Sequence, residues 1–329
     1  EYRSEPPMKE IKVTKNDSGQ RIDRFLSKSF PLGQGQICKL ARKNCIKLNG
    51  KKCKPDTHIA ENDIIKLFIP DEMLIPKAKS DPDDFTGVSN KIDIVYEDEN
   101  ILLVDKPVGM VVHEDESGDS DTLINRIKSY LYHKGEYHPE NELSFAPALC
   151  NRIDRNTCGI VIAAKNAESL RILNQKIRDR ELTKLYLCIA CGKVTPDSTT
   201  LTAYLEKNSD TNTVKISDKK TNSNLTIKTK YKVIAYNGEN SLLKVDLLTG
   251  RTHQIRAHLA YIGHALLGDG KYGNNKLNKK YGFKYQALCS YELQFKFTTD
   301  AGCLSYLDGK CFKAKAPDFV KMFGGNIKL

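Results

Sequence analysis

The feature that most constrains the fold is a charged segment, residues 151–159, that leads directly into an apolar run, residues 160–164. The charged segment ends in a glycine and holds one carboxylate, Asp154, between Arg152 and Arg155. A short continuous apolar run bounded by turn residues predicts a buried strand. Catalytic residues commonly lie on charged loops at the ends of rigid strands. The segment therefore predicts a functional loop at the end of a sheet strand.

Composition is that of a globular protein. Of 329 residues, 40% are hydrophobic and 28% are charged, which allows two domains or one large domain with an appendage. No uninterrupted apolar stretch approaches the length that crosses a bilayer, and the polar N-terminus carries no apolar signal region. We therefore expect a cytoplasmic protein with no membrane partner.

The net charge of +11 is unevenly distributed along the chain. Residues 1–70 carry +7, residues 71–150 carry −11 and residues 151–329 carry +15. Two basic blocks thus flank an acidic block, and basic surfaces attract the phosphate backbones of nucleic acids. Lysines that only keep a surface soluble give the same total, so charge alone leaves both interpretations open.

Ten cysteines do not predict a disulfide framework. Several lie in apolar runs, and a chain of this length does not need covalent staples. We expect reduced thiols that pack as small hydrophobic side chains. Cys188 and Cys191 have the spacing of half a zinc motif, but no second pair or histidine cluster accompanies them, so no metal site is predicted.

Residues 9–70 are predicted to form a small α/β unit. Apolar residues recur at helical spacing over residues 21–30, and a second short helix is predicted over residues 36–43. A hairpin with an Asn-Gly turn over residues 46–54 and a closing strand over residues 63–69 complete the unit.

Two basic helices followed by a small basic hairpin resemble the RNA-binding domain first seen in ribosomal protein S4. The resemblance covers about residues 20–69, although an ordinary α/β lobe with a solvated basic face shows a similar pattern. Residues 70–90 hold three prolines among charged residues, and residues 71–90 are predicted to be an extended linker to a second domain, residues 91–329. The resemblance implies that RNA phosphates contact the following cations of the small unit: Arg21, Arg24, Lys39, Arg42 and Lys43.

The second domain alternates strand and helix patterns. A helix is predicted over residues 121–132, and Asn166 is suited to cap another helix. One strand alternates cleanly, so that Leu185 and Leu187 share one face and Tyr186 lies on the other. Strands are predicted over residues 94–96, 101–104, 160–164, 184–194 and 242–248.

A second group of cations and imidazoles lies on a helix predicted between residues 252 and 263. His253 and Arg256 are three residues apart and share a face that is distinct from the apolar one. An arginine placed there can meet a carboxylate from another loop, and Asp154 is the natural candidate. Such a pair would hold the carboxylate ionised and oriented as a nucleophile, and Tyr186 would offer a ring for a base and a hydroxyl group for proton handling.

These segments occur in an order that resembles the motifs of the RluA-type pseudouridine synthases, enzymes that isomerise uridine within RNA. The matching segments are residues 101–113, 152–159, 184–186, 247–256 and 267–273. The resemblance covers about residues 92–317. It implies an α+β protein in which the small S4-like domain precedes a catalytic domain built on a mixed, mainly antiparallel sheet with flanking helices.

The resemblance also implies the roles of the site residues. Asp154 would be the nucleophile, Tyr186 would pack on the target base and assist proton removal at carbon 5, and Arg256 would pair with Asp154. It implies no metal, nucleotide or redox cofactor, ribosomal RNA as the partner, and a monomer. The RNA would be contacted by Arg152, Arg155, Arg251 and His253.

Two positions depart from the family pattern. The family usually has His where Asn151 stands, and Ser or Thr where Cys158 stands. Neither position is the nucleophile, so we expect the reaction to be retained with altered hydrogen bonding in the loop.

Three other interpretations remain open. A non-catalytic RNA-binding or ribosome-assembly protein would be expected to lack Asp154, Tyr186 or Arg256, and all three are present. A synthase with transfer RNA as its substrate would carry the same catalytic motifs. A metal-dependent hydrolase would use His253, His258 and His264, whose spacing is poor for one helix face.

Overall fold

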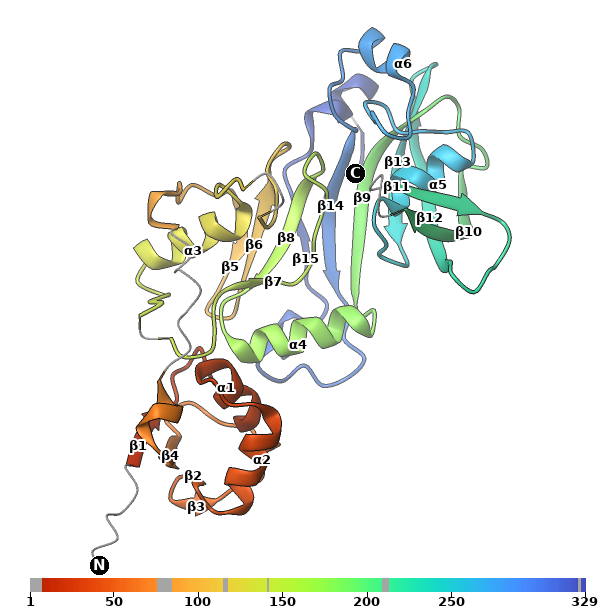
Figure 1. Cartoon of the computed structure of the whole chain (residues 1–329). Coiled ribbons are helices and arrows are strands. Elements are labelled where there is room, and N and C mark those ends of the chain that lie inside the picture. The colour runs from red at the N-terminus through yellow and green to blue at the C-terminus, as the bar shows by residue number, and fades with distance from the viewer. Residues whose placement is uncertain (1–7, 76–84, 115–117, 141, 209–212, 325–326) are drawn as a thin grey trace, which may run out of the picture.

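The structure is a computed structural model that describes residues 8–75, 85–114, 118–140, 142–208, 213–324 and 327–329. Figure 1 shows a small N-terminal unit next to a larger part built on a long, twisted sheet. The sequence predicts a disordered lead-in over residues 1–8 and a hairpin with a mobile tip over residues 206–224; residues 1–7 and 209–212 of these segments lie outside the described residues. No helix among the described residues is long and apolar enough to cross a membrane.

The N-terminal unit is a four-stranded antiparallel sheet covered by two helices. Its strand order is β1 (Met8–Lys12), β4 (Ile64–Phe68), β2 (Ile46–Leu48), β3 (Lys51–Lys52). The helices are α1 (Ile22–Ser29) and α2 (Gln34–Arg42), within two residues of the predicted spans. The buried face of α1 carries Ile22, Phe25 and Leu26, which join strand residues in one apolar core.

Strand β1 was not predicted from the sequence. It buries only Ile11 of its five residues, so it shows no alternation that a pattern could detect. Its pairing with β4 at the sheet edge is what makes it a strand. The sheet of the N-terminal unit is therefore completed by a contact between distant segments rather than by a local preference.

The linker expected over residues 71–90 is structured at both ends. The 3-10 helix η1 (Asp71–Leu74) packs Met73 and Leu74 on the core of the N-terminal unit. At the other end, Phe85 in η2 (Phe85–Gly87) packs on the core that contains α3 (Leu123–His133). The segment that joins the two parts is therefore shorter than expected.

The larger part is an eleven-stranded sheet. One neighbouring pair, β8 with β14, is parallel, and the other described pairs are antiparallel, so the predicted mixed, mainly antiparallel sheet is confirmed. The main path runs β11 (Thr213–Ser217), β10 (Ser198–Asn208), β12 (Leu225–Tyr236), β13 (Asn240–Leu247), β9 (Leu182–Cys191), β14 (Leu288–Phe295), β8 (Cys158–Ala164), β6 (Ile101–Lys106), β5 (Ile94–Glu97), with β7 (Ala148–Leu149) beside β8 and β15 (Cys311–Lys313) beside β14.

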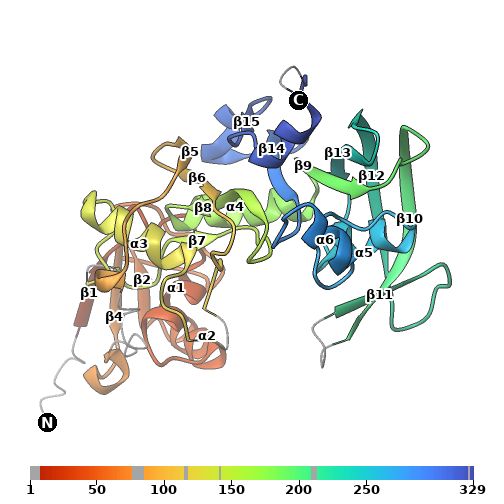
Figure 2. The same cartoon turned by 90° about the horizontal axis from the view of Figure 1, so that it is seen from above.

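The two faces of this sheet pack against separate apolar cores. The side chains of β9 alternate between these two cores, which confirms the alternation predicted for this strand. Leu187 and Ile189 face the core that includes Leu173 of α4 (Ala167–Arg178) and the C-terminal 3-10 helices η3 (Gly302–Leu307) and η4 (Asp318–Phe323). Tyr186 faces the core formed with α3 (Leu123–His133) and α5 (Gln254–Tyr261). Figure 2 shows α3 and α5 on one side of the sheet and the C-terminal segment on the other.

Three helices begin at residues whose polar side chains cap them. The side chain of Asn166 accepts a hydrogen bond from the backbone N–H of Ser169 at 2.8 Å, as predicted for the start of α4. Thr122 caps α3 and Asn274 caps α6 (Asn275–Lys280) in the same way.

All ten cysteines are free thiols, and Cys188 and Cys191 lie on β9 without forming a metal ligand group.

Candidate active site

A buried lysine, Lys106, holds the loop that carries Asp154 in place. The ammonium group of Lys106, at the end of β6, donates hydrogen bonds to the carbonyl oxygens of Pro107, Met110 and Arg155 at 2.8–2.9 Å. The backbone N–H of Gly109 donates to the same Arg155 oxygen at 2.9 Å. Three acceptors match the three donors of an ammonium group, so Lys106 joins the two segments that border Asp154.

Burial lowers the pKa of Lys106 to about 8. The side chain is fully buried, yet the ammonium form still predominates at neutral pH because the pKa lies above 7. The charge of Asp154 acts in the opposite direction and supports that form. The lysine therefore serves the loop as a charged hydrogen-bond donor.

Gly159 marks the point where the loop enters β8. Its φ is +107°, a backbone conformation that side chains with a Cβ rarely adopt. An added Cβ would lie 2.2 Å from the carbonyl oxygen of Ser290 on β14. The parallel pairing of β8 and β14 therefore requires glycine here, directly below the site.

Arg256 of α5 lies between two carboxylates. Its Nη1 donates to Oδ2 of Asp154 at 2.7 Å, which places the predicted pair together. Its Nε and Nη2 donate to the two oxygens of Asp269 at 2.7 and 3.0 Å, a bidentate arrangement that fixes the guanidinium plane. The side chain of Asp154 is 29% exposed, so this carboxylate remains accessible from solvent.

The surroundings of Arg256 and Asp269 keep both side chains charged. Burial alone would lower the pKa of Arg256, but the hydrogen bonds and charge of Asp269 and the charge of Asp154 raise it. Burial alone would raise the pKa of Asp269, but Arg256 and two backbone N–H groups lower it. Arg256 is therefore a permanently charged and rigid partner of Asp154.

Tyr186 lies in the core face beside this pair. It is paired across the sheet with Ser290, whose hydroxyl donates to the carbonyl oxygen of Ile160 at 3.3 Å. Burial raises the pKa of Tyr186 to about 12, and the nearby charge of Asp154 acts in the same direction. The phenol is therefore protonated at neutral pH.

His253 approaches Asp154 from the start of α5, in a left-handed conformation with φ of 52°. The hydroxyl of Tyr272 accepts the backbone N–H of Val214 at 2.9 Å, so its single proton is available for Nδ1 of His253, also at 2.9 Å. With Tyr272 as the donor, the proton of the neutral imidazole lies on Nε2. Nε2 lies 3.9 Å from Oδ2 of Asp154, too far for a hydrogen bond.

The other predicted cations near the site are exposed. Arg152 and Arg155 flank Asp154 on the loop, and Arg251 precedes α5. In the N-terminal unit, Arg21 forms a fork with the buried carboxylate of Asp23 at 3.1 and 2.6 Å. The remaining predicted cations of that unit lie exposed on or directly after its helices: Arg24, Lys39, Arg42 and Lys43.

The two departures from the family pattern have local partners. The side-chain oxygen of Asn151 accepts the backbone N–H of Ile162 at 2.8 Å, which ties the loop to β8. Cys158 lies opposite Cys289 across the β8–β14 pair, and its thiol approaches the carbonyl oxygen of Leu288 at 3.7 Å. Both side chains therefore support the loop from its ends.

The three histidines considered for a hydrolase each contact a different partner. Nδ1 of His253 contacts Tyr272, Nδ1 of His258 contacts Thr229, and Nδ1 of His264 contacts the carbonyl oxygen of Cys191. Among the residues that the structure describes, no group of three or more His, Cys, Asp or Glu side chains could hold a metal ion.

Three residues of the site were not predicted from the sequence: Asp269, Tyr272 and Lys106. Asp269 and Tyr272 lie in the segment 267–273, which resembles the family without implying a role for either residue. The signal for Lys106 was weak, because a lysine at the end of an apolar strand is usually exposed. Only the hydrogen bonds of its ammonium group to three carbonyl oxygens explain why this side chain is buried.

Comparisons with known proteins agree with this geometry. A family model described as RNA pseudouridylate synthase matches residues 100–261. An uncharacterized RNA pseudouridine synthase of Mycoplasma genitalium is 35% identical over 291 residues, which cover 86% of this chain and 88% of that protein. Ribosomal large subunit pseudouridine synthase D of Borreliella burgdorferi is 33% identical over 268 residues, with coverage of 79% and 78%.

Solved structures show the same fold. Human RNA pseudouridylate synthase domain containing 4 has a TM-score of 0.55 at 18% identity and covers 70% of this chain and 90% of its own. Human RNA pseudouridylate synthase domain containing 1 has a TM-score of 0.53 at 21% identity, with coverage of 70% and 84%.

Fold, motifs and relatives together define an RNA-modifying isomerase. The chain belongs to the RNA pseudouridine synthase family, and within it to the RluA type, as predicted.

Proposed function

We propose that this enzyme isomerises specific uridines of large-subunit ribosomal RNA to pseudouridine, with Asp154 as the nucleophile. The observation that carries the proposal is the contact of Asp154 with Arg256, at 2.7 Å, on a loop held by buried groups. A partly exposed carboxylate that is oriented before substrate arrives suits nucleophilic catalysis. The choice of ribosomal RNA is supported by the names of two relatives, the ribosomal large subunit pseudouridine synthases C and D.

The reaction needs no net change in composition. The target uridine leaves its helix and enters the site, at an unstacking cost of roughly a few kcal/mol. Asp154 attacks either the pyrimidine ring or the anomeric carbon of the ribose, and the bond between N1 and the anomeric carbon breaks. The uracil then rotates and its carbon 5 bonds to the anomeric carbon, the bond to Asp154 breaks so that the carboxylate is regenerated, carbon 5 loses its proton, and N1 gains one.

Tyr186 and His253 have distinct parts in this proposal. Tyr186 supplies the face on which the uracil stacks, and its phenol starts the reaction protonated, so it acts as a donor rather than as the initial base. The Nε2–H of His253 points toward the space next to Asp154 and donates to an oxygen of the nucleotide. Arg152, Arg155 and Arg251 contact phosphates around the flipped residue.

The N-terminal unit is proposed to be an S4-like RNA-binding domain. Four exposed cations on or directly after two short helices offer a surface for the phosphate backbone. Arg21 has a different part, because its guanidinium already holds Asp23 at the start of α1. We place the enzyme, as a monomer, in the cytoplasm where ribosomal RNA is modified.

A pseudouridine map tests the proposal. Total RNA from cells with and without the protein is labelled with carbodiimide and read as reverse-transcription stops. We expect stops in large-subunit ribosomal RNA that vanish on deletion and return with the wild type but not with Asp154→Ala. Stops that change in transfer RNA instead would replace the proposed target, and an unchanged map would support the binding-protein interpretation.

A further inference from the structure

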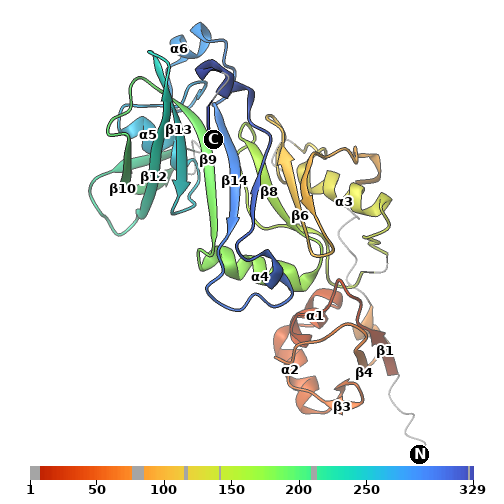
Figure 3. The same cartoon turned by 180° about the vertical axis from the view of Figure 1, so that it is seen from behind.

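The N-terminal unit is joined to the catalytic part by a buried polar contact, here called the joint. It is formed by the loop 16–20 on one side and by residues 142–144 and the start of α4 on the other. Figures 1 and 3 show the unit lying beside α4 at one end of the large sheet. None of the joint residues belongs to the segment 71–90 that connects the two parts along the chain.

Asp17 and Ser144 form the centre of the joint. The carboxylate of Asp17, which is 1% exposed, accepts hydrogen bonds from the hydroxyl of Ser144 at 2.5 Å and from its backbone N–H at 3.2 Å. The side-chain amide of Gln20 donates to the same hydroxyl at 2.5 Å. Because each bond has a required direction, this arrangement permits one orientation of the two surfaces.

Further contacts surround this centre. The carbonyl oxygen of Asn16 accepts the backbone N–H of Ala167 at 2.9 Å, and its side-chain amide donates to Glu142 at 2.5 Å. Leu143 packs on the apolar core of the N-terminal unit. Gly19 lies so close to α4 that an added Cβ would be 2.5 Å from Cβ of Glu168.

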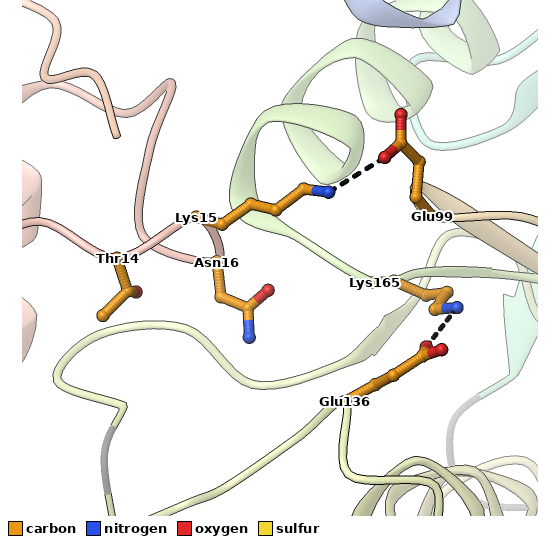
Figure 4. A pocket seen from close by; sticks show the side chains of 6 residues that line it. All are labelled: Thr14, Lys15, Asn16, Glu99, Glu136 and Lys165. Atoms are coloured by element: carbon orange, nitrogen blue, oxygen red, sulfur yellow. Dashed lines mark hydrogen bonds and ion pairs between the residues drawn. The ribbon is translucent and has the colours of Figure 1, made fainter. Parts of the chain in front are cut away.

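Both sides of the joint are rigid. The loop 16–20 is tied to its own unit, because the backbone groups of Gly19 and Gln20 bond to those of Ile59 at 2.8 and 3.0 Å. On the opposite side, the cap residue of α4 is itself bonded to Asn100 at 3.0 Å. Figure 4 shows the rim, where Lys15 forms an exposed ion pair with Glu99 at 3.0 Å, beside the pair of Lys165 with Glu136.

We infer that the joint holds the N-terminal unit at one fixed position relative to Asp154 and thereby determines which uridines are modified. A uridine is accepted when it lies at the right spacing from the RNA element bound by the N-terminal unit. The inference rests on the proposed RNA-binding role of that unit. Asp17 and Ser144 are thus specificity-determining residues that touch no reacting atom.

A charge placed in the joint tests this role. Ser144→Asp sets a second carboxylate against Asp17 and should open the joint by like-charge repulsion. Asp17→Asn combined with Ser144→Asp restores a donor opposite the new carboxylate and should close it again. Ser305→Asp adds the same charge at an exposed position outside the joint. Hydrogen exchange of peptides covering residues 14–20 and 142–147 reports whether the joint is open.

Activity is then compared on two RNAs: a short stem-loop that carries the mapped target uridine, and the whole ribosomal RNA. Ser144→Asp should keep kcat/KM on the stem-loop within about twofold of the wild type and lose about tenfold or more on the whole RNA, because a loosened tether lowers the effective concentration of the site. It should also modify additional uridines. The double variant should recover the wild-type rate and pattern.

The outcomes separate this inference from the proposed function. Unchanged exchange in Ser144→Asp, or an open joint with wild-type rates and sites, would overturn the inference. Charge reversal by Lys39→Glu with Arg42→Glu tests the RNA-binding role itself. If neither this variant nor Ser144→Asp lowers the rate on whole RNA, the proposed RNA-binding role of the N-terminal unit fails. If this variant lowers the rate and Ser144→Asp does not, only the role of the joint fails.

Discussion

The Nη1 atom of Arg256 lies 2.7 Å from Oδ2 of Asp154, and the rest of the same guanidinium is held by Asp269. The orientation of Asp154 is therefore set before any RNA arrives. An oriented nucleophile needs less reorganisation at the moment of reaction than a mobile one. This relationship makes Asp269 a positioning residue, since its own side chain is fully buried.

Asp269→Asn should lower kcat about 10- to 100-fold with a smaller change in KM, because Arg256 loses one charged partner and its orientation. Single-turnover kinetics on a target RNA would measure the split. Asp179→Asn, at the exposed end of α4, serves as a control that should match the wild type. A change in KM as large as the change in kcat, or no change in either, would contradict a role of Asp269 in positioning Asp154.

The same variant should change the response of stability to acid. The pKa of Asp269 is lowered in the folded protein, so its contribution is present above the unfolded pKa of about 3.9 and is lost as pH falls through the folded pKa. Asp269→Asn should therefore be less stable at pH 7 and lose less of its stability on acidification. Denaturant titrations at a series of pH values would show whether the two curves converge in acid.

Lys106→Met should destabilise the fold by about 2–4 kcal/mol, because it leaves three carbonyl oxygens without their donor. Equilibrium unfolding in urea would measure this. The exposed Lys232→Met on β12 should stay within about 0.5 kcal/mol of the wild type. Equal effects of the two substitutions would contradict the supporting role of Lys106.

Tyr186→Phe should retain activity within about tenfold, whereas Tyr186→Ala should lose at least about a hundredfold, because the ring rather than an ionised phenol carries the role. With the pKa of Tyr186 raised to about 12, no limb of the pH–rate profile below pH 10 should belong to its ionisation. Rates measured from pH 6 to 10 in wild type and Tyr186→Phe would reveal such a limb as a difference in shape.

Neutralising Arg42 and Lys43 should weaken RNA binding at low salt and reduce the slope of log affinity against log salt by about one for each phosphate that the protein no longer neutralises. Filter binding of ribosomal RNA over a salt series gives that slope. Lys276→Gln, on the short helix α6, is a matched control with an exposed lysine. An unchanged slope in the double variant Arg42→Gln and Lys43→Gln would contradict phosphate binding at α2.

Local patterns predicted much of the fold. Alternation placed Tyr186 on the face opposite Leu187, helical spacing located α1, and Asn166 marked the cap of α4. The contact between Asp154 and Arg256 was also predicted, because the family resemblance related two segments that no local rule connects. Each of these signals is carried by residues close in the sequence or by a known motif.

Other features depend on contacts between distant segments and gave no such signal. Strand β1 exists because β4 offers an edge, and Lys106 is buried because three carbonyl oxygens converge on it. The joint of Asp17 with Ser144 links polar residues that are unremarkable in their own segments. Tertiary packing decides these positions, so periodicity and propensity cannot predict them.

The most direct test of the account is the fate of the carbon 5 hydrogen of the target uridine. Ribosomal RNA transcribed with uridine tritiated at carbon 5 is incubated with wild type, Asp154→Asn and Asp179→Asn. We expect tritium release by the wild type and by Asp179→Asn, and a loss of at least about 10⁴-fold in Asp154→Asn at undiminished RNA affinity. Release by Asp154→Asn near the wild-type rate would contradict Asp154 as the nucleophile.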